Sequence, residues 1–136
     1  GLYQDKFNVL YWMANARNVN GKVESEGEVI VRVGNEVHYE RKYGVGPVHA
    51  LDNALREVIA RVFKVLEKTE LLNYKVSVTE GDSHGTASYV RVLIEFGDNM
   101  LRWSTTGVSK NILEASIKAI TDGYNYRLAL EDLNKS

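Results

Sequence analysis

The chain of 136 residues contains no cysteine, so it can form neither a disulfide nor a thiolate metal site. Nothing in that composition argues for secretion, and we expect a cytoplasmic protein. No apolar run approaches the roughly 20 residues of a membrane-spanning helix, and no signal peptide is visible. A net charge of −1 with mixed signs lacks the basic footprint of a nucleic-acid-binding protein. With 44% hydrophobic residues, the chain can still bury the core of one domain.

Proline is almost absent as well, and the one proline, Pro47, marks the most informative stretch of the chain. It follows Gly44 and Gly46, which let the backbone turn sharply, and it precedes a run with helical periodicity. Proline fits the first position of a helix, where its missing N–H would have had no partner. The pattern predicts a loop that enters a helix. The apolar stripe of that helix is Val48, Leu51, Leu55, Val58, Ile59, Val62, Phe63 and Leu66.

The start of this helix is a possible anion site. A glycine loop at a helix N-terminus leaves backbone N–H groups pointing outward at the positive end of the helix dipole, where a carboxylate or phosphate can bind. The alternative is a tight turn that starts a core helix and binds nothing. Sequence reasoning on the loop leaves both interpretations open.

The remaining segments predict six strands and a second helix. Alternating or apolar residues typical of strands occur at 7–16, 28–33, 37–43, 71–79, 87–96 and 100–105. The second helix follows Ser109, which is a plausible N-cap. Its expected inner stripe of mostly small side chains, suited to close packing against another helix, is Ile112, Ala115, Ser116, Ala119, Ile120 and Gly123.

The two halves of the chain resemble each other. Gly34 and Gly97 each end a Val-rich strand and open a polar turn, and they lie 63 residues apart. We therefore expect an α+β fold of duplicated βββα units, about 7–68 and 71–130, with antiparallel sheets packed against two long helices in a single domain. The small-residue stripe and the apolar strand Val90–Ile94 further suggest a homodimer.

The sequence offers few candidates for catalytic residues. His38, His49 and His84 have no short spacing that would join two of them as metal ligands, so we expect no metal site. Asp82, Ser83 and His84 are neighbours, but adjacency in sequence does not make a catalytic triad and a solvated loop explains them as well.

One short motif favours a different class and is weak. The residues Gly46–His49 spell a loop sequence found in double-stranded-RNA-binding domains. The helix that starts here lacks the basic cluster that such domains need, so we expect no nucleic-acid partner.

Several longer segments together resemble one family. They are Gly44–Leu51, Tyr74-Lys75-Val76, Gly85-Thr86-Ala87 and Arg102–Ser116. From about residue 7 to 126 the chain resembles the C-terminal regulatory domain of the 2-isopropylmalate synthase and citramalate synthase family. The run 103–116 is more similar to the citramalate branch.

The resemblance implies a function. In that family a pair of βββα units dimerises and binds the end product of the pathway, isoleucine for citramalate synthases and leucine for isopropylmalate synthases, which inhibits a distant catalytic barrel. The barrel, with its divalent metal and its acetyl-CoA and 2-oxo acid pockets, is absent from this sequence, which also lacks an initiator methionine. We therefore expect a piece of a longer protein that regulates without catalysing and needs no cofactor of its own.

The resemblance also implies an effector site with two parts. Backbone N–H groups of the loop would meet the carboxylate of the amino acid, and a strand region would hold its aliphatic side chain. The family more often has Asp or Asn at the position of His49. The loop residues are Gly44, Gly46, Pro47, Val48 and His49, and the aliphatic pocket residues are Leu71, Tyr74, Val78, Ala87 and Tyr89. A purely structural dimerisation module and an unrelated binding module with the same duplication stay open as alternatives.

Overall fold

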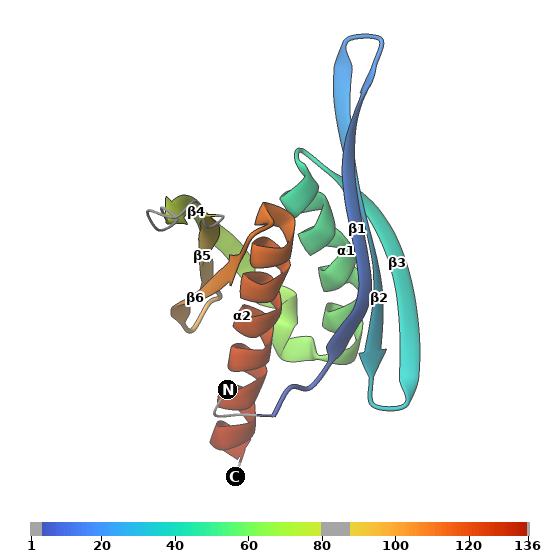
Figure 1. Ribbon diagram of the computed structural model, residues 1–136. Helices are drawn as coiled ribbons and strands as arrows, with labels where there is room; N and C mark the ends of the chain where they lie inside the picture. The colour runs from blue at the N-terminus through green and yellow to red at the C-terminus, as the bar shows by residue number, and fades with distance from the viewer. Residues whose placement is uncertain (1–3, 80–87, 136) are drawn as a thin grey trace. The chain divides into compact units, whose positions relative to one another are not determined.

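A computed structural model describes residues 4–79 and 88–135 (Figure 1). The chain divides into two compact units, unit 1 of residues 1–67 with 125–136 and unit 2 of residues 68–124. Within each unit, a three-stranded antiparallel sheet in sequence order packs against a helix. The expected α+β fold of two βββα units is confirmed.

Unit 1 contains β1 (Asn8–Val19), β2 (Lys22–Val33), β3 (Glu36–Gly44) and α1 (Pro47–Val62), followed by the short 3-10 helix η1 (Lys64–Lys68). Tight turns with left-handed residues at Asn20, Gly21 and Gly34 join the strands. Alternation along β2 places Val29 and Val31, both fully buried, on the face that α1 covers.

The helix α1 lies directly on the backbone of this sheet. A Cβ added at Gly27 would be 2.6 Å from the backbone nitrogen of Leu51, and one added at Gly44 would be 2.5 Å from that of Ala50. Glycine at these two strand positions therefore admits the helix. The fully buried residues of α1 are Ala50, Leu51, Ala54, Leu55, Val58 and Ile59.

The predicted stripe of α1 is right in its centre and wrong at its end. Val62 is 42% exposed, and Phe63 is the C-cap residue in an extended conformation. The helix ends there, so the apolar periodicity continues into η1, where Leu66 is buried.

Unit 2 contains β4 (Glu70–Thr79), β5 (Tyr89–Gly97) and β6 (Arg102–Ser109), and α2 (Ile112–Lys135) begins within it. The strands bind the helix through two side chains that donate to its backbone carbonyls. Trp103 Nε1 donates to the Gly123 oxygen at 2.9 Å, and Thr105 Oγ1 donates to the Ala119 oxygen at 2.6 Å. These buried bonds set the position of α2 along β6.

The small-residue stripe of α2 has a different role from the one predicted. We expected it to pack against another helix, but it faces the sheet of its own unit. Gly107 lies opposite Ala115, and Phe96 lies against Gly123. Small side chains are needed because the strands and the helix approach each other closely.

The start of α2 also differs from the sequence-based expectation. Ser109 is the last residue of β6, and Asn111 caps the helix. The Asn111 Oδ1 atom accepts from the backbone N–H groups of Leu113 at 2.8 Å and Glu114 at 3.0 Å. Asn and Ser have similar preferences for the N-cap position, so residue type alone could not show which of the two caps the helix.

Gly107→Ala tests the close approach in unit 2. A Cβ at residue 107 would lie 2.0 Å from the Ala115 carbonyl oxygen, which is helix backbone and cannot swing aside. We expect the free energy of unfolding to fall by about 1–3 kcal/mol, the usual cost of overpacking. Urea denaturation followed by circular dichroism measures it.

Gly46→Ala is the matched control, because a Cβ there meets nothing within 4 Å. Its cost should be at most about 1 kcal/mol, since alanine is a poorer N-cap than glycine. Equal losses of stability in the two variants would contradict the interpretation of Gly107.

Candidate functional site

The loop between β3 and α1 is held at both ends by side chains of the helix. The backbone N–H of Val45 donates to His49 Nδ1 at 3.0 Å, and Asn53 Nδ2 donates to the Tyr43 carbonyl oxygen at 2.9 Å. Gly46 is the N-cap residue, and no side chain caps the helix there. Sequence reasoning missed the roles of His49 and Asn53, although their places one and two turns after the loop were a usable signal.

The two loop glycines serve purposes other than a sharp turn. Gly46 has φ −152° and ψ 171°, an extended conformation open to any residue. Among the described residues, positive φ occurs only at Asn20, Gly21 and Gly34. The sharp turn expected of these two glycines is therefore not what they provide: Gly44 is needed for close approach of α1, and Gly46 leaves the helix start uncovered.

A hollow of about 510 Å³ adjoins the loop, on the side of the β1–β2 hairpin. Lys22 and Glu24 bring charges of opposite sign to it, and Val23 and Val45 bring apolar surface. An amino acid carries the same combination of two opposite charges and, when branched, an apolar side chain. The full lining is Lys22, Val23, Glu24, Ser25, Tyr43, Gly44 and Val45.

The predicted aliphatic residues lie in unit 2, on two different faces of its sheet. Tyr74 pairs with Ile94 and Val78 pairs with Val90, on the face that α2 covers. Leu71 pairs with Phe96 on that same face. These side chains share a face because directly opposed residues of antiparallel strands point the same way.

Tyr89 lies on the opposite face of that sheet. It pairs with Thr79, and the Lys110 Nζ atom lies 5.8 Å from the centroid of its ring. Ala87 lies outside the described residues. The loop residues belong to unit 1 and the strand residues to unit 2.

Tyr74 has a structural partner of its own. Its hydroxyl lies 2.9 Å from Ser116 Oγ, and that hydroxyl donates to the Ile112 carbonyl oxygen at 2.7 Å. Tyr74 must then be the donor in the pair, because the serine proton is already used. The ring is still 37% exposed, while Val78 is 65% exposed, so both offer apolar surface beyond the edge of the helix.

A second hollow of about 680 Å³ lies in unit 1, near the C-terminal end of α2. Its lining includes Lys6, Lys64, Leu128 and Asp132. Lys6 Nζ lies 2.5 Å from Asp132 Oδ2, so these charges are already paired.

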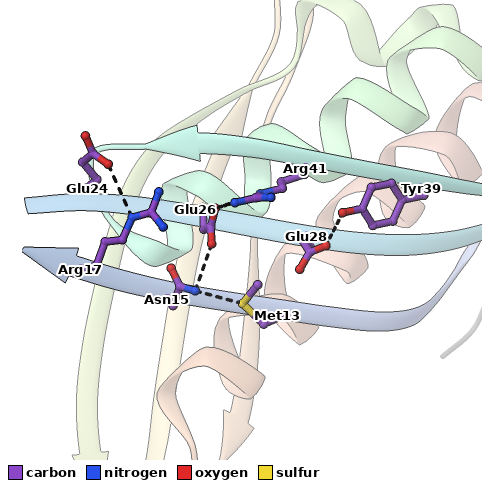
Figure 2. Close-up of polar contacts among 8 residues, drawn as sticks. All are labelled: Met13, Asn15, Arg17, Glu24, Glu26, Glu28, Tyr39 and Arg41. Atoms are coloured by element: carbon purple, nitrogen blue, oxygen red, sulfur yellow. Dashed lines mark hydrogen bonds and ion pairs between the residues drawn. The ribbon is translucent and has the colours of Figure 1, made fainter. Parts of the chain in front are cut away.

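The uncovered face of the sheet in unit 1 carries a row of paired polar groups (Figure 2). Glu26 accepts hydrogen bonds from Arg41, at 2.8 Å from Nε and also from Nη2, and from Asn15 Nδ2 at 3.1 Å. The hydrogen bond from Arg41 is the main cause that lowers the pKa of Glu26. The Tyr39 hydroxyl donates to Glu28, and this bond raises the pKa of Tyr39.

The same face of the sheet also exposes apolar and aromatic side chains. Its exposed side chains include Tyr11, Val37, Tyr39 and Tyr43, each between 46% and 57% exposed. Such a mixed surface is typical of a protein–protein contact.

The described residues contain no cluster of three His, Cys, Asp or Glu side chains that could hold a metal ion. His38 Nε2 lies 3.3 Å from Glu36 Oε2 on β3, whereas His49 lies on α1 and His84 is outside the described residues. None of the helices in ranges 4–79 and 88–135 is long and apolar enough to cross a membrane.

Comparison with known proteins gives a consistent result. Residues 3–128 match the family described as the LeuA allosteric (dimerisation) domain. An (R)-citramalate synthase from Geobacter sulfurreducens is 45% identical over 112 residues, covering 82% of the chain and 21% of that protein. The (R)-citramalate synthase of Sulfolobus acidocaldarius is 40% identical over 139 residues, covering 100% of the chain and 24% of that protein.

A more distant relative is a 2-isopropylmalate synthase from Methanocaldococcus jannaschii, 28% identical over 108 residues, covering 79% of the chain and 19% of that protein. The chain thus spans only about a fifth to a quarter of the length of these relatives.

Glu26→Gln should change how stability depends on pH. The pKa of Glu26 lies below its ordinary value of 4.5 in the folded chain. A carboxyl with a depressed folded-state pKa stabilises the fold above its unfolded-state pKa, and this contribution is lost as the pH falls through the folded-state value. We expect the variant to be less stable than the parent at neutral pH, with a gap that closes below about pH 4.5.

Denaturant titrations of the parent and the variant between pH 7 and pH 3 measure this gap. Glu24→Gln is the control, because Glu24 makes only an exposed ion pair with Arg17 at 3.6 Å and should leave a small gap at every pH. A gap for Glu26→Gln that stays constant down to pH 3 would refute the role assigned to Arg41.

Proposed function

The chain belongs to the family of LeuA allosteric (dimerisation) domains, and on that premise we propose that it binds a branched-chain amino acid and thereby mediates end-product inhibition of a citramalate synthase. The match over residues 3–128 carries this proposal. In this proposal, the condensation of acetyl-CoA with pyruvate and the divalent metal belong to a catalytic barrel of the parent protein. The chain is a single regulatory domain that acts on this barrel in the cytoplasm.

Isoleucine is the proposed effector. Relatives that are 45% and 40% identical are named (R)-citramalate synthase, whereas the 2-isopropylmalate synthase relative is 28% identical. The citramalate branch is the one for which the resemblance implies isoleucine. Leucine is the alternative effector, because a 2-isopropylmalate synthase also occurs among the relatives beside the (R)-citramalate synthases.

The chemistry of the loop supports an amino acid as the ligand. The N-terminus of α1 has no side-chain cap, so the first backbone N–H groups of the helix, at Val48 and His49, suit a carboxylate. A Cβ at Gly46 would meet nothing within 4 Å, which leaves that approach open. Beside the loop, Lys22 and Glu24 bring charges of opposite sign, as a zwitterion requires, and Glu24 also pairs with Arg17 at 3.6 Å.

A surface for an aliphatic side chain is proposed within unit 2 by itself. Leu71, Tyr74 and Val78 share one face of its sheet, and the latter two keep exposed apolar surface. Tyr89 lies on the opposite face and is not part of this surface, and Ala87 lies outside the described residues. Burial of one branched side chain on this surface would contribute about 1.5–3 kcal/mol to binding.

We further propose that two copies of the chain form a homodimer. The two sequence features that suggested a dimer are not available for it. The small-residue stripe of α2 faces the sheet of its own unit, and Val92 and Ile94 of β5 are fully buried. The family is described as a dimerisation domain, and the uncovered sheet face of unit 1 exposes Tyr11 and Tyr39. A purely structural dimerisation module is the second candidate function, favoured by this same surface.

A thermal-shift screen of the chain against the twenty amino acids separates the two functions. At a hundred times its Kd, isoleucine should add about 2.7 kcal/mol to the free energy of unfolding. Leucine should stabilise less at equal concentration, since an apolar pocket discriminates displaced methyl groups by about 1–3 kcal/mol. No shift with any branched-chain amino acid would leave the structural module as the function.

Val78→Ala and Gly46→Ala test the two proposed surfaces, one in each unit, in the same screen. Val78→Ala should alter the ranking of isoleucine, leucine and valine at little cost in stability, because the side chain is 65% exposed. Gly46→Ala should weaken all three alike by obstructing the carboxylate. If Gly46→Ala binds isoleucine as tightly as the parent, the loop is only a helix start.

Sedimentation equilibrium at micromolar concentration tests the homodimer. The expected mass is twice that of the chain, because the paired charges and aromatic side chains on the uncovered sheet face can be buried against a second copy. Tyr39→Glu, which places a second acid beside Glu28, should shift the equilibrium towards monomer. A monomeric parent that still binds isoleucine would rule out the dimer and spare the effector proposal.

A further inference from the structure

The loop that precedes α1 depends on one titratable side chain. His49 occupies the third position of the helix, and its Nδ1 accepts the backbone N–H of Val45 at 3.0 Å. In a capping box the third helical residue, usually glutamate or glutamine, accepts the backbone N–H of the N-cap residue. Here the N-cap residue is Gly46, and His49 reaches one residue further back, to the N–H of Val45.

An imidazole nitrogen accepts a hydrogen bond only while it carries no proton. The contact therefore requires neutral His49 with its proton on Nε2. Protonation would turn Nδ1 into a donor that faces the Val45 N–H, and it would add a positive charge at the positive end of the helix dipole. Both effects oppose the contact, so the charged form releases Val45.

We propose that His49 is the positioning residue of the effector loop, which it holds through the Val45 N–H, and that the loop is consequently sensitive to pH. Histidine is the side chain that changes charge between about pH 5 and 8. Neutral His49 keeps Val45 and Gly46 in the conformation that exposes the start of α1. The part of this inference that concerns a ligand rests on the proposed function, whereas the part that concerns the loop does not.

The other ionisable groups around the loop cannot produce the same response. Lys22 and Glu24 of β2 and Tyr43 of β3 line the hollow beside Val45, and Asp52 follows on α1, 3.8 Å from Arg56. Side chains of these types ordinarily change charge outside the range of imidazole. The other described histidine, His38, lies on β3 beside Glu36 and serves as a control.

His49→Gln and His49→Ala separate the proposed role from a general effect on folding. Glutamine supplies a side-chain acceptor that does not titrate, and from the third helical position such an acceptor can reach backbone N–H groups at the helix start. Alanine supplies no acceptor. His49 is exposed, so both variants should fold, which circular dichroism verifies. His38→Gln removes a different imidazole and leaves the contact intact.

The first measurement follows the Val45 amide by NMR between pH 8 and pH 5 in the absence of any amino acid. We expect this resonance to move with a single titration in the parent and in His38→Gln, and to stay in place in His49→Gln. A Val45 amide that does not respond in the parent, or that responds equally in His49→Gln, would overturn the proposal.

The second measurement is calorimetry with isoleucine at pH 8, where imidazole is neutral and charge effects cancel. His49→Ala should bind about three- to tenfold more weakly than the parent, as expected for the loss of one hydrogen bond. His49→Gln should stay within about twofold of the parent. Equal affinity of all three proteins would refute the positioning role. Absence of isoleucine binding by the parent would refute the proposed function, and the Val45 amide would still decide the contact.

Discussion

Each helix lies so close to its sheet that a Cβ has no room at the crossing points. In unit 1 the backbone of α1 passes over Gly27 and Gly44, where an added Cβ would lie 2.6 Å and 2.5 Å from helix nitrogens. In unit 2 the Ala115 carbonyl would lie 2.0 Å from a Cβ at Gly107. Interiors of this density do not deform to accept an extra carbon, so these glycines determine where each helix can lie.

This constraint also places the candidate loop. Gly44 is the last residue of β3 and at the same time a contact of α1, so the loop starts from a point that core packing holds. The contacts from His49 to Val45 and from Asn53 to Tyr43 then hold its remaining length. A ligand on this loop would bind next to the buried helix, and it would stabilise the folded chain to a degree set by its concentration relative to its Kd.

Several features could be predicted because they depend on residues near in sequence. Pro47 at the first helical position, the turn at Gly34 and the alternation of Val29 and Val31 follow from local backbone preference and periodicity. Other features could not. Ser109 and Asn111 are similar caps, and only the length of β6 selects Asn111. Val62 continues the apolar period of α1, but it is the last helical residue and is 42% exposed, because the helix ends at Phe63.

The sequence by itself determined the two βββα units, because strand and helix periods and the single proline are local signals, and matching residues 63 positions apart reveal the repeat directly. It also determined the family, through segments that resemble those of known regulatory domains. Only the tertiary structure decided what the small residues contact, that Tyr89 lies on the sheet face opposite Tyr74, and that His49 accepts from Val45. These facts depend on strand register and on the distance between helix and sheet, which arise when residues far apart in the chain pack together.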